Sequence, residues 1–334
     1  MRIISGVFFL TVFLFACRKE IPLPETVNAG SSSVLVLNEG NFMWSNASVD
    51  LYNLDSGLLK SNVYQQVNGK PLGDVLQSGS IINGDIWLVL NNTGKISVLD
   101  SHTLKEKYSI TSLGSPRYAL RVENQVWITD LWSGTLQVRD LTGNQLMAKL
   151  HTGSWTEQMV NTGGKVWVAC YDGWIRKYDA VQLRKADSVY IGKGLRWMVK
   201  DKNSHVWALA SFNDSGFSRL QQWSSDGKKM KDFTMPLSGY ASSLCINDGG
   251  DTLYYLSNGV YSMGIDELKL PVTPIYKRSG ANFYHIAYHP SRNLIFLCDA
   301  ADYVSKGTVY ILNSSGAEIS KFKAGIIPSG FVFY

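Results

Sequence analysis

Asp85-Ile86-Trp87-Leu88-Val89-Leu90 is a short apolar run built around a tryptophan, and runs of the same kind return at a fixed distance. Tryptophans stand at positions 87, 127, 167 and 207, each 40 residues after the last. A turn, Asn91-Asn92-Thr93-Gly94, follows the first run, and a second strand-like run, Lys95–Asp100, comes next. Because strands joined by turns and repeated at this spacing are typical of propeller blades, the sequence predicts a β-propeller.

Extending the period gives seven copies of the apolar strand, with Tyr254-Tyr255 or Phe296 replacing the tryptophan in later copies. These strands lack polar alternation, as expected when neighbouring sheets cover both of their faces. The seven strands are Val34–Leu37, Ile86–Leu90, Val126–Thr129, Val166–Cys170, Val206–Leu209, Leu253–Leu256 and Leu294–Leu297. A further strand is predicted before five of them, at Tyr118–Val122, Gln158–Asn161, Arg196–Lys200, Ser242–Ile246 and Tyr284–Tyr288.

The two ends of the repeat array complement each other. Residues 329–334 have the character of a preceding strand, but no apolar strand follows them. The first copy, at Val34, has no such strand before it. We therefore expect an all-β, seven-bladed β-propeller over residues 34–334, in which the C-terminal strand completes the first blade and closes the ring. Closure removes the exposed strand edges that an open array would present.

The first residues resemble an export signal. Arg2 precedes an almost wholly apolar segment, Ile3–Ala16, of about 14 residues, too short for a spanning helix, which needs roughly 20. The segment ends in Leu14-Phe15-Ala16-Cys17, which resembles a bacterial lipoprotein signal. We expect residues 1–17 to be a lipoprotein signal peptide ending at the lipidated Cys17. Residues 18–33, rich in proline and serine, would then form a flexible tether to a lipid anchor.

Composition agrees with one exported domain. Of the 334 residues, 45% are hydrophobic and only 18% are charged, which allows a large core. The net charge of +5 is modest, and the lysines and arginines of the chain cluster on the predicted outer hairpins. We therefore do not expect nucleic acid as a partner. Cys170, Cys245 and Cys298 lie in different copies without a paired spacing, and we expect buried thiols rather than a disulfide framework.

Catalytic patterns are weak, and we expect a protein that is not an enzyme and has neither a metal nor a cofactor. His285 and His289 lie on one predicted strand, and their spacing does not favour a metal site. A metal-dependent propeller hydrolase or lactonase stays open as an alternative. Its carboxylates and amides would be Glu39, Asn91, Asp130, Asp172 and Asp299, all just after the apolar strands.

Aromatic and amide side chains are frequent in the turns after the apolar strands and at the start of each blade. These segments share one face of a propeller, where they converge on a ligand. Flat rings with amide and guanidinium partners suit a large planar ligand or a glycan better than a small ion. Trp44, Trp132 and Trp155 stand in turns, where the core does not need them. The expected ligand-binding residues are Asn38, Glu39, Asn41, Trp44, Asn91, Arg117, Tyr118, Trp132, Trp155, Tyr171, Trp174, Arg196, Trp197, Tyr240, Tyr284 and Tyr303.

Four motifs carry a family resemblance. Val34–Phe42 and Ser45–Tyr52 resemble the opening of YncE-like propeller lipoproteins of Bacteroidetes, and Ser115–Leu120 and Val126–Leu131 look like their blade patterns. The resemblance covers essentially residues 33–334. It implies a lipid-anchored binding protein of the outer membrane, at the cell surface, without catalytic activity. It further implies capture of cobalamin or another corrinoid as a transported ligand and transfer to a TonB-dependent outer-membrane transporter. A glycan or an iron chelate remains an alternative ligand.

Overall fold

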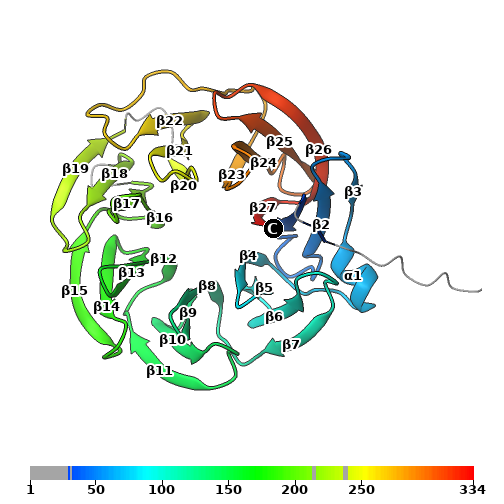
Figure 1. Cartoon of the computed structure of the whole chain (residues 1–334), viewed down its shortest axis with the longest axis horizontal. Helices are drawn as coiled ribbons and strands as arrows, with labels where there is room; N and C mark the ends of the chain where they lie inside the picture. The colour runs from blue at the N-terminus through cyan, green and yellow to red at the C-terminus, as the bar shows by residue number, and fades with distance from the viewer. Residues whose placement is uncertain (1–28, 31, 213–215, 236–239) are drawn as a thin grey trace, which may run out of the picture.

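The structure, a computed structural model, describes residues 29–30, 32–212, 216–235 and 240–334. The proposed signal peptide, Cys17 and the tether up to residue 28 lie outside these ranges. The described strands form seven separate antiparallel sheets, arranged as blades around a central axis (Figure 1). In these ranges no helix has both the length and the apolar character needed to cross a membrane.

Each blade is a small meander, and we number the blades 1 to 7 in chain order. The innermost strands, from blade 1 to blade 7, are β27 (Pro328–Phe333), β4 (Leu76–Ile82), β8 (Pro116–Val122), β12 (Thr156–Thr162), β16 (Leu195–Lys200), β20 (Ser242–Ile246) and β23 (Phe283–His289). The second strands are β1 (Ser33–Asn38), β5 (Asp85–Leu90), β9 (Gln125–Asp130), β13 (Lys165–Cys170), β17 (Val206–Ala210), β21 (Thr252–Leu256) and β24 (Leu294–Asp299).

The outer half of each blade is more variable. The third strands are β2 (Ser48–Asn53), β6 (Lys95–Asp100), β10 (Thr135–Asp140), β14 (Trp174–Asp179), β18 (Arg219–Trp223), β22 (Val260–Gly264) and β25 (Lys306–Asn313). The outermost strands are β3 (Leu59–Lys60), β7 (Glu106–Ile110), β11 (Leu146–His151), β15 (Arg184–Tyr190), β19 (Lys229–Thr234) and β26 (Glu318–Ile326). Blade 6 has three strands among the described residues, and a short helix, α1 (Val63–Asn68), lies outside the ring beside blade 1.

The predicted fold class is confirmed, and the structure adds detail to the strand positions. The tryptophan-bearing strands are second from the axis, and the strands predicted before them line the channel. Sequence analysis missed β4, because Ser78-Gly79-Ser80 interrupts its apolar pattern. Gly79 fits closely there, since a β-carbon would lie 2.9 Å from the Cγ2 atom of Val332 in blade 1 and would force that side chain to shift.

The core consists of layers between adjacent blades. Trp87 packs with Val126 and Ile128 of the next blade, and Trp127 packs in the same way with Val166 and Val168. The four ladder tryptophans are each at most 1% exposed. Because one face of every second strand contacts the preceding blade and the other face the following blade, continuous apolar runs are needed. The absence of polar alternation in the sequence therefore has a direct structural cause.

Blade 1 closes the ring, as predicted, by pairing the two ends of the chain. In the antiparallel pair β1–β27, Val34 lies opposite Phe333, Leu35 opposite Val332 and Val36 opposite Phe331. Phe331 and Phe333 also pack on the Phe296 ring of blade 7, at centroid distances of 5.2 and 5.3 Å. The C-terminal strand therefore contributes both a hydrogen-bonded ladder and an interblade contact. Figure 1 shows β27 beside β1 and β2, on the side of the channel.

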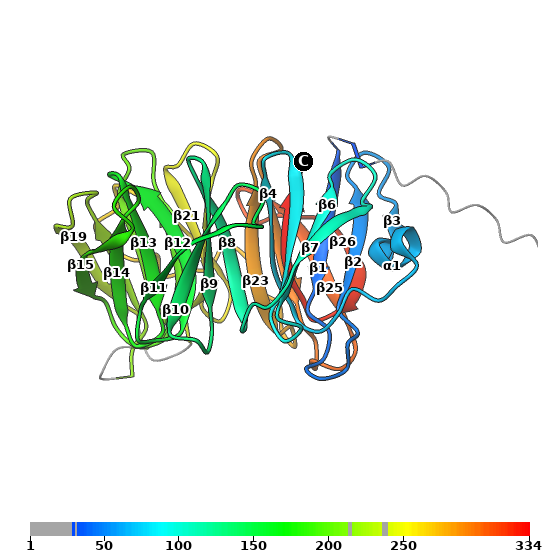
Figure 2. The same cartoon turned by 90° about the horizontal axis from the view of Figure 1, so that it is seen from below.

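The two faces of the ring differ. At one face, the lower one in Figure 2, the innermost strands begin and the second strands end; we call it the mouth face. At the opposite, back face, the Ala29 amide donates to the His102 carbonyl at 3.1 Å, in the turn between β6 and β7. The described chain thus starts at the face away from the mouth.

Deleting residues 331–334 is expected to lower the unfolding temperature by on the order of 10 °C, because it removes the buried Val332, two phenylalanine contacts and most of the β1–β27 ladder. Differential scanning calorimetry of the deletion and of Val181→Ala, at an exposed position, measures this. A deletion variant with the midpoint of the full chain would show that closure does not stabilise the ring.

Candidate ligand-binding site

An irregularity recurs at the mouth end of the innermost strands. In blades 2 to 7 the register with the second strand shifts within the first residues, at Leu76/Ser78, Pro116/Ala119, Thr156/Met159, Leu195/Trp197, Ser242/Leu244 and Phe283/His285. Such bulges turn a side chain out of the regular alternation. The residues within these shifts include Gln77, Arg117, Tyr118, Glu157, Arg196 and Tyr284, all of which line the cavity at the channel mouth.

The mouth cavity has a volume of about 590 Å³, within the range of small-molecule sites. Nine of the sixteen predicted ligand-binding residues line it: Glu39, Arg117, Tyr118, Trp155, Arg196, Trp197, Tyr240, Tyr284 and Tyr303. They come from loops and strands of all blades except blade 2, and tertiary structure brings them together. Sequence reasoning missed Gln77, Glu157, Ser242, Asn282, Phe283 and His285, which line the same cavity.

A charged network crosses the floor of the cavity between blades 2, 3 and 4. Arg117 Nε donates to Glu157 Oε2 at 2.9 Å, and Arg117 Nη2 donates to Glu157 Oε1 at 3.1 Å. Arg117 Nη1 donates to Gln77 Oε1. The Glu157 side chain is 1% exposed, so this bidentate pair is buried and fixed in orientation. A ligand therefore meets a rigid polar floor.

A second carboxyl, Glu39, faces the cavity from the loop after β1. The Tyr284 hydroxyl donates to both carboxylate oxygens of Glu39 at 3.2 Å. Burial raises the pKa of Glu39 to about 7, although Arg117 and the Tyr284 hydrogen bond oppose the shift. The cavity thus holds a carboxyl group whose charge changes near neutral pH.

Aromatic rings form an arc along one side of the mouth, which we define as Trp132, Trp155, Tyr171, Phe212 and Tyr240. Neighbouring rings in this order have centroid distances of 4.9, 5.0, 6.4 and 6.5 Å. The Arg196 guanidinium lies over the Tyr171 ring at 5.1 Å. A second hollow of about 410 Å³ adjoins the cavity along Trp132, Trp155 and Tyr171. The mouth therefore combines a polar floor with an apolar wall.

Five predicted ligand-binding residues lie elsewhere. Asn38 is buried and donates to Ser48 and Asp50, and Asn91 donates to the carbonyls of Ser115 and Pro116, so both hold loops in place. Trp174 packs on Tyr190 in the outer half of blade 4. Asn41 and Trp44 belong to the loop between β1 and β2, which projects from the mouth face; Glu39 of this loop lines the cavity, but Asn41 and Trp44 do not.

The missed residues Gln77 and Glu157 did leave a sequence pattern. Gln77, Arg117, Glu157 and Trp197 recur every 40 residues, each ten positions before a ladder tryptophan. The repeat therefore places one side chain from each of these blades at the same height of the channel. A search at this fixed offset finds Gln77 and Glu157, whereas a search for turn residues does not.

The acidic and amide residues of the hydrolase alternative do not converge. Asp130 accepts from the amides of Ser115, Trp132 and Ser133, and Asp172 pairs with Arg176 at 2.7 Å. Asp299 accepts from the amides of Asn282 and Ala301. Of the five candidates, only Glu39 lines the mouth cavity.

The predicted strand histidines face different surroundings. His285 accepts from or donates to Ser243 Oγ at 3.0 Å, and burial lowers its pKa to about 4. His289 lies between Phe296 and Phe333. In the ranges described, no three His, Cys, Asp or Glu side chains are grouped so that they could hold a metal ion.

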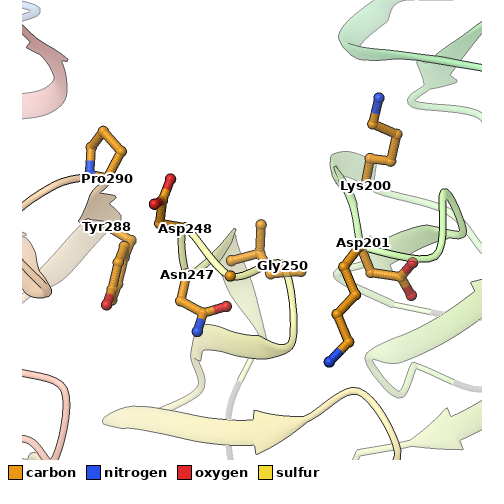
Figure 3. A pocket seen from close by; sticks show the side chains of 10 residues that line it. Lys200, Asp201, Asn247, Asp248, Gly250, Tyr288 and Pro290 are labelled. Atoms are coloured by element: carbon orange, nitrogen blue, oxygen red, sulfur yellow. The ribbon is translucent and has the colours of Figure 1, made fainter.

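The back face carries a separate hollow of about 380 Å³ between blades 5, 6 and 7. Figure 3 shows Asn247 and Asp248 between Tyr288 and Pro290 on one side and Lys200 and Asp201 on the other. Asp201 is used by the protein itself, since its carboxylate accepts from Trp207 Nε1 and from the Asn203 amide. This hollow lacks the aromatic wall and the buried ion pair of the mouth, which is therefore the stronger candidate site.

Glu39→Gln is expected to stabilise the protein more at pH 8 than at pH 5. In the unfolded chain the Glu39 carboxyl has its usual pKa of 4.5, whereas in the folded protein its pKa is about 7. Ionisation of Glu39 therefore lowers the free energy of unfolding as the pH rises from 4.5 to 7, and the full loss is present above pH 7. The difference amounts to about 2–3 kcal/mol. Urea unfolding at both pH values, with the exposed Glu123→Gln as control, measures it; equal effects of Glu39→Gln at both pH values would contradict the assignment.

Comparisons with known proteins agree with the fold. A quinonprotein alcohol dehydrogenase-like protein from Bacteroides thetaiotaomicron superposes with a TM-score of 0.72 at 15% identity, covering 91% of this chain and 78% of that one. A putative 6-phosphogluconolactonase from Bacteroides fragilis has a TM-score of 0.67 at 11% identity, covering 90% and 96%. BamB from Moraxella catarrhalis has a TM-score of 0.59 at 16% identity, covering 92% and 88%. At such identities the likeness shows the fold alone.

Sequence comparison gives the family without an activity. No curated protein matches the chain. A family model matches residues 32–334, the whole of the propeller. The chain therefore belongs to the family described as "Domain of unknown function (DUF5074)".

Proposed function

We propose that this protein is a non-catalytic binding protein that captures a corrinoid, such as cobalamin, at the mouth of the propeller. The observation that carries the proposal is the aromatic arc beside the polar floor of the mouth cavity. A corrinoid has a broad macrocycle with apolar faces and a rim of amide groups. The arc suits the faces of the macrocycle, and Arg117, Gln77 and Asn282 suit the amides.

The size of the mouth supports a large ligand. The central cavity of about 590 Å³ and the adjoining hollow of about 410 Å³ share Trp155, so one ligand can extend over both. Such a ligand would place a polar part in the cavity and a flat part along Trp132 and Tyr171.

The backbone at Trp132, Trp155 and Tyr171 of the arc is held in place before any ligand binds. Asp130 accepts from the amides of Trp132 and Ser133, and Thr156 Oγ1 donates to the Asp130 carbonyl at 2.8 Å. The Tyr171 amide donates to the Trp155 carbonyl at 3.0 Å. Because little ordering is needed on binding, more of the contact energy is retained as affinity.

We propose that the protein acts at the cell surface. A lipid anchor at Cys17 would hold the chain on the outer membrane through the tether, which joins the propeller near Ala29 on the back face. The captured corrinoid would then pass to a TonB-dependent outer-membrane transporter. A glycan or an iron chelate is the alternative ligand for the same arc and polar floor.

Calorimetric titration of the full chain with cyanocobalamin is expected to show 1:1 binding. Trp155→Ala should weaken it by about 10- to 100-fold, because Trp155 is shared by both hollows. Trp174→Ala removes a tryptophan from outside the site and should leave the affinity unchanged. Absence of heat together with absence of retention on a cobalamin column would refute the proposal, and binding of a glycan or ferric chelate instead would establish the alternative.

A further inference from the structure

Four large apolar side chains project from the mouth face beside the cavity. Phe42, Met43 and Trp44, in the loop between β1 and β2, are 65%, 76% and 75% exposed, and Val304, in the loop between β24 and β25, is 69% exposed. We call these four residues the tip. The two loops extend together below the ring in Figure 2, and Asn41 Nδ2 donates to the Tyr303 carbonyl at 2.7 Å.

The tip has a fixed conformation. The Met43 amide donates to Asp74 Oδ2 at 2.9 Å, and the Asn41 amide donates to Asn46 Oδ1 at 2.7 Å. Met43 and Ser45 have φ angles of 68° and 49°, in the left-handed region, where each non-glycine residue costs on the order of 1 kcal/mol. The β1–β2 loop is therefore held in a strained backbone conformation in which the side chains of Phe42, Met43 and Trp44 are exposed to water. Such exposure of large apolar side chains is typical of a preformed binding surface.

Charge favours a protein over an anionic bilayer as the partner. The loop segments 39–47 and 300–305 contain no lysine or arginine, and their charged residues, Glu39 and Asp302, are acidic. Surfaces that bind anionic membranes instead combine apolar residues with basic ones.

We propose that the tip is the docking surface for a protein partner that presents an apolar pocket rimmed by hydrogen-bond donors or cationic side chains. Tryptophan, phenylalanine and methionine are enriched at such interface centres, and Asp302 supplies the acidic rim. Tyr303 both lines the cavity and carries the carbonyl that binds Asn41, so a docked partner stands beside the mouth. The inference rests on the proposed function in naming the transporter as that partner.

Photo-crosslinking in the native host tests the inference on the full-length, processed protein. A benzoylphenylalanine replaces Trp44 in one strain and Leu268, an equally exposed apolar residue of blade 6, in another. The expected result is one adduct from position 44, identified by mass spectrometry as a TonB-dependent outer-membrane transporter, and no adduct from position 268. The purified transporter should then bind Trp44→Ser at least about tenfold more weakly than the unmodified protein, and bind Leu268→Ser normally.

Three outcomes would overturn the inference: equal or absent adducts at the two positions, an adduct between two copies of this chain, or Trp44-dependent flotation with vesicles of phosphatidylcholine and phosphatidylglycerol. Cyanocobalamin titration separates this inference from the proposed function. Trp44→Ser should keep the affinity of the unmodified protein for cyanocobalamin, because Trp44 does not line the cavity. If the adduct forms but the protein binds no cyanocobalamin, the result supports the docking surface and contradicts the proposed ligand.

Discussion

Pairing between β1 and β27 is the constraint on which the rest of the molecule depends. It joins the two ends of the described propeller and makes seven blades a closed ring, so that every second strand is covered on both faces. Without it, the Val34 and Leu35 ladder would be an open edge and the Phe296 cluster would lose two of its rings. Closure completes the cluster between blades 7 and 1, and the channel mouth is enclosed by the closed ring.

The closed ring also explains how a repetitive scaffold carries a non-repetitive site. The innermost strands begin with a register shift at the same height, and in five blades the shift delivers a different side chain to the cavity: Gln77, Arg117, Glu157, Arg196 or Tyr284. The geometry is common to the blades, while the chemistry varies from blade to blade. A rigid ring with a variable lining is well suited to binding a large asymmetric ligand.

The tryptophans outside the 40-residue ladder divide into different roles. Trp132 and Trp155 form part of the aromatic arc, Trp174 packs in the outer half of blade 4, and Trp44 stands exposed at the tip. Their turns look alike in the sequence. What separates them is the length and direction of each loop relative to the channel, which depends on contacts such as the one between Asn41 and Tyr303.

The amino-acid sequence by itself determined the all-β class, the seven blades and the closure, because a strict period of apolar strands leaves few other ways to bury them. It also indicated nine of the cavity residues, since turns after second strands share one face of a propeller. Only the tertiary structure decided that Glu157 and Gln77 belong to the site and that Asn38, Asn91 and Trp44 do not. The physical reason is that bulges and loop hydrogen bonds set the direction of each side chain: the 40-residue offset marks the positions of Gln77 and Glu157, but only the structure shows that these side chains enter the cavity.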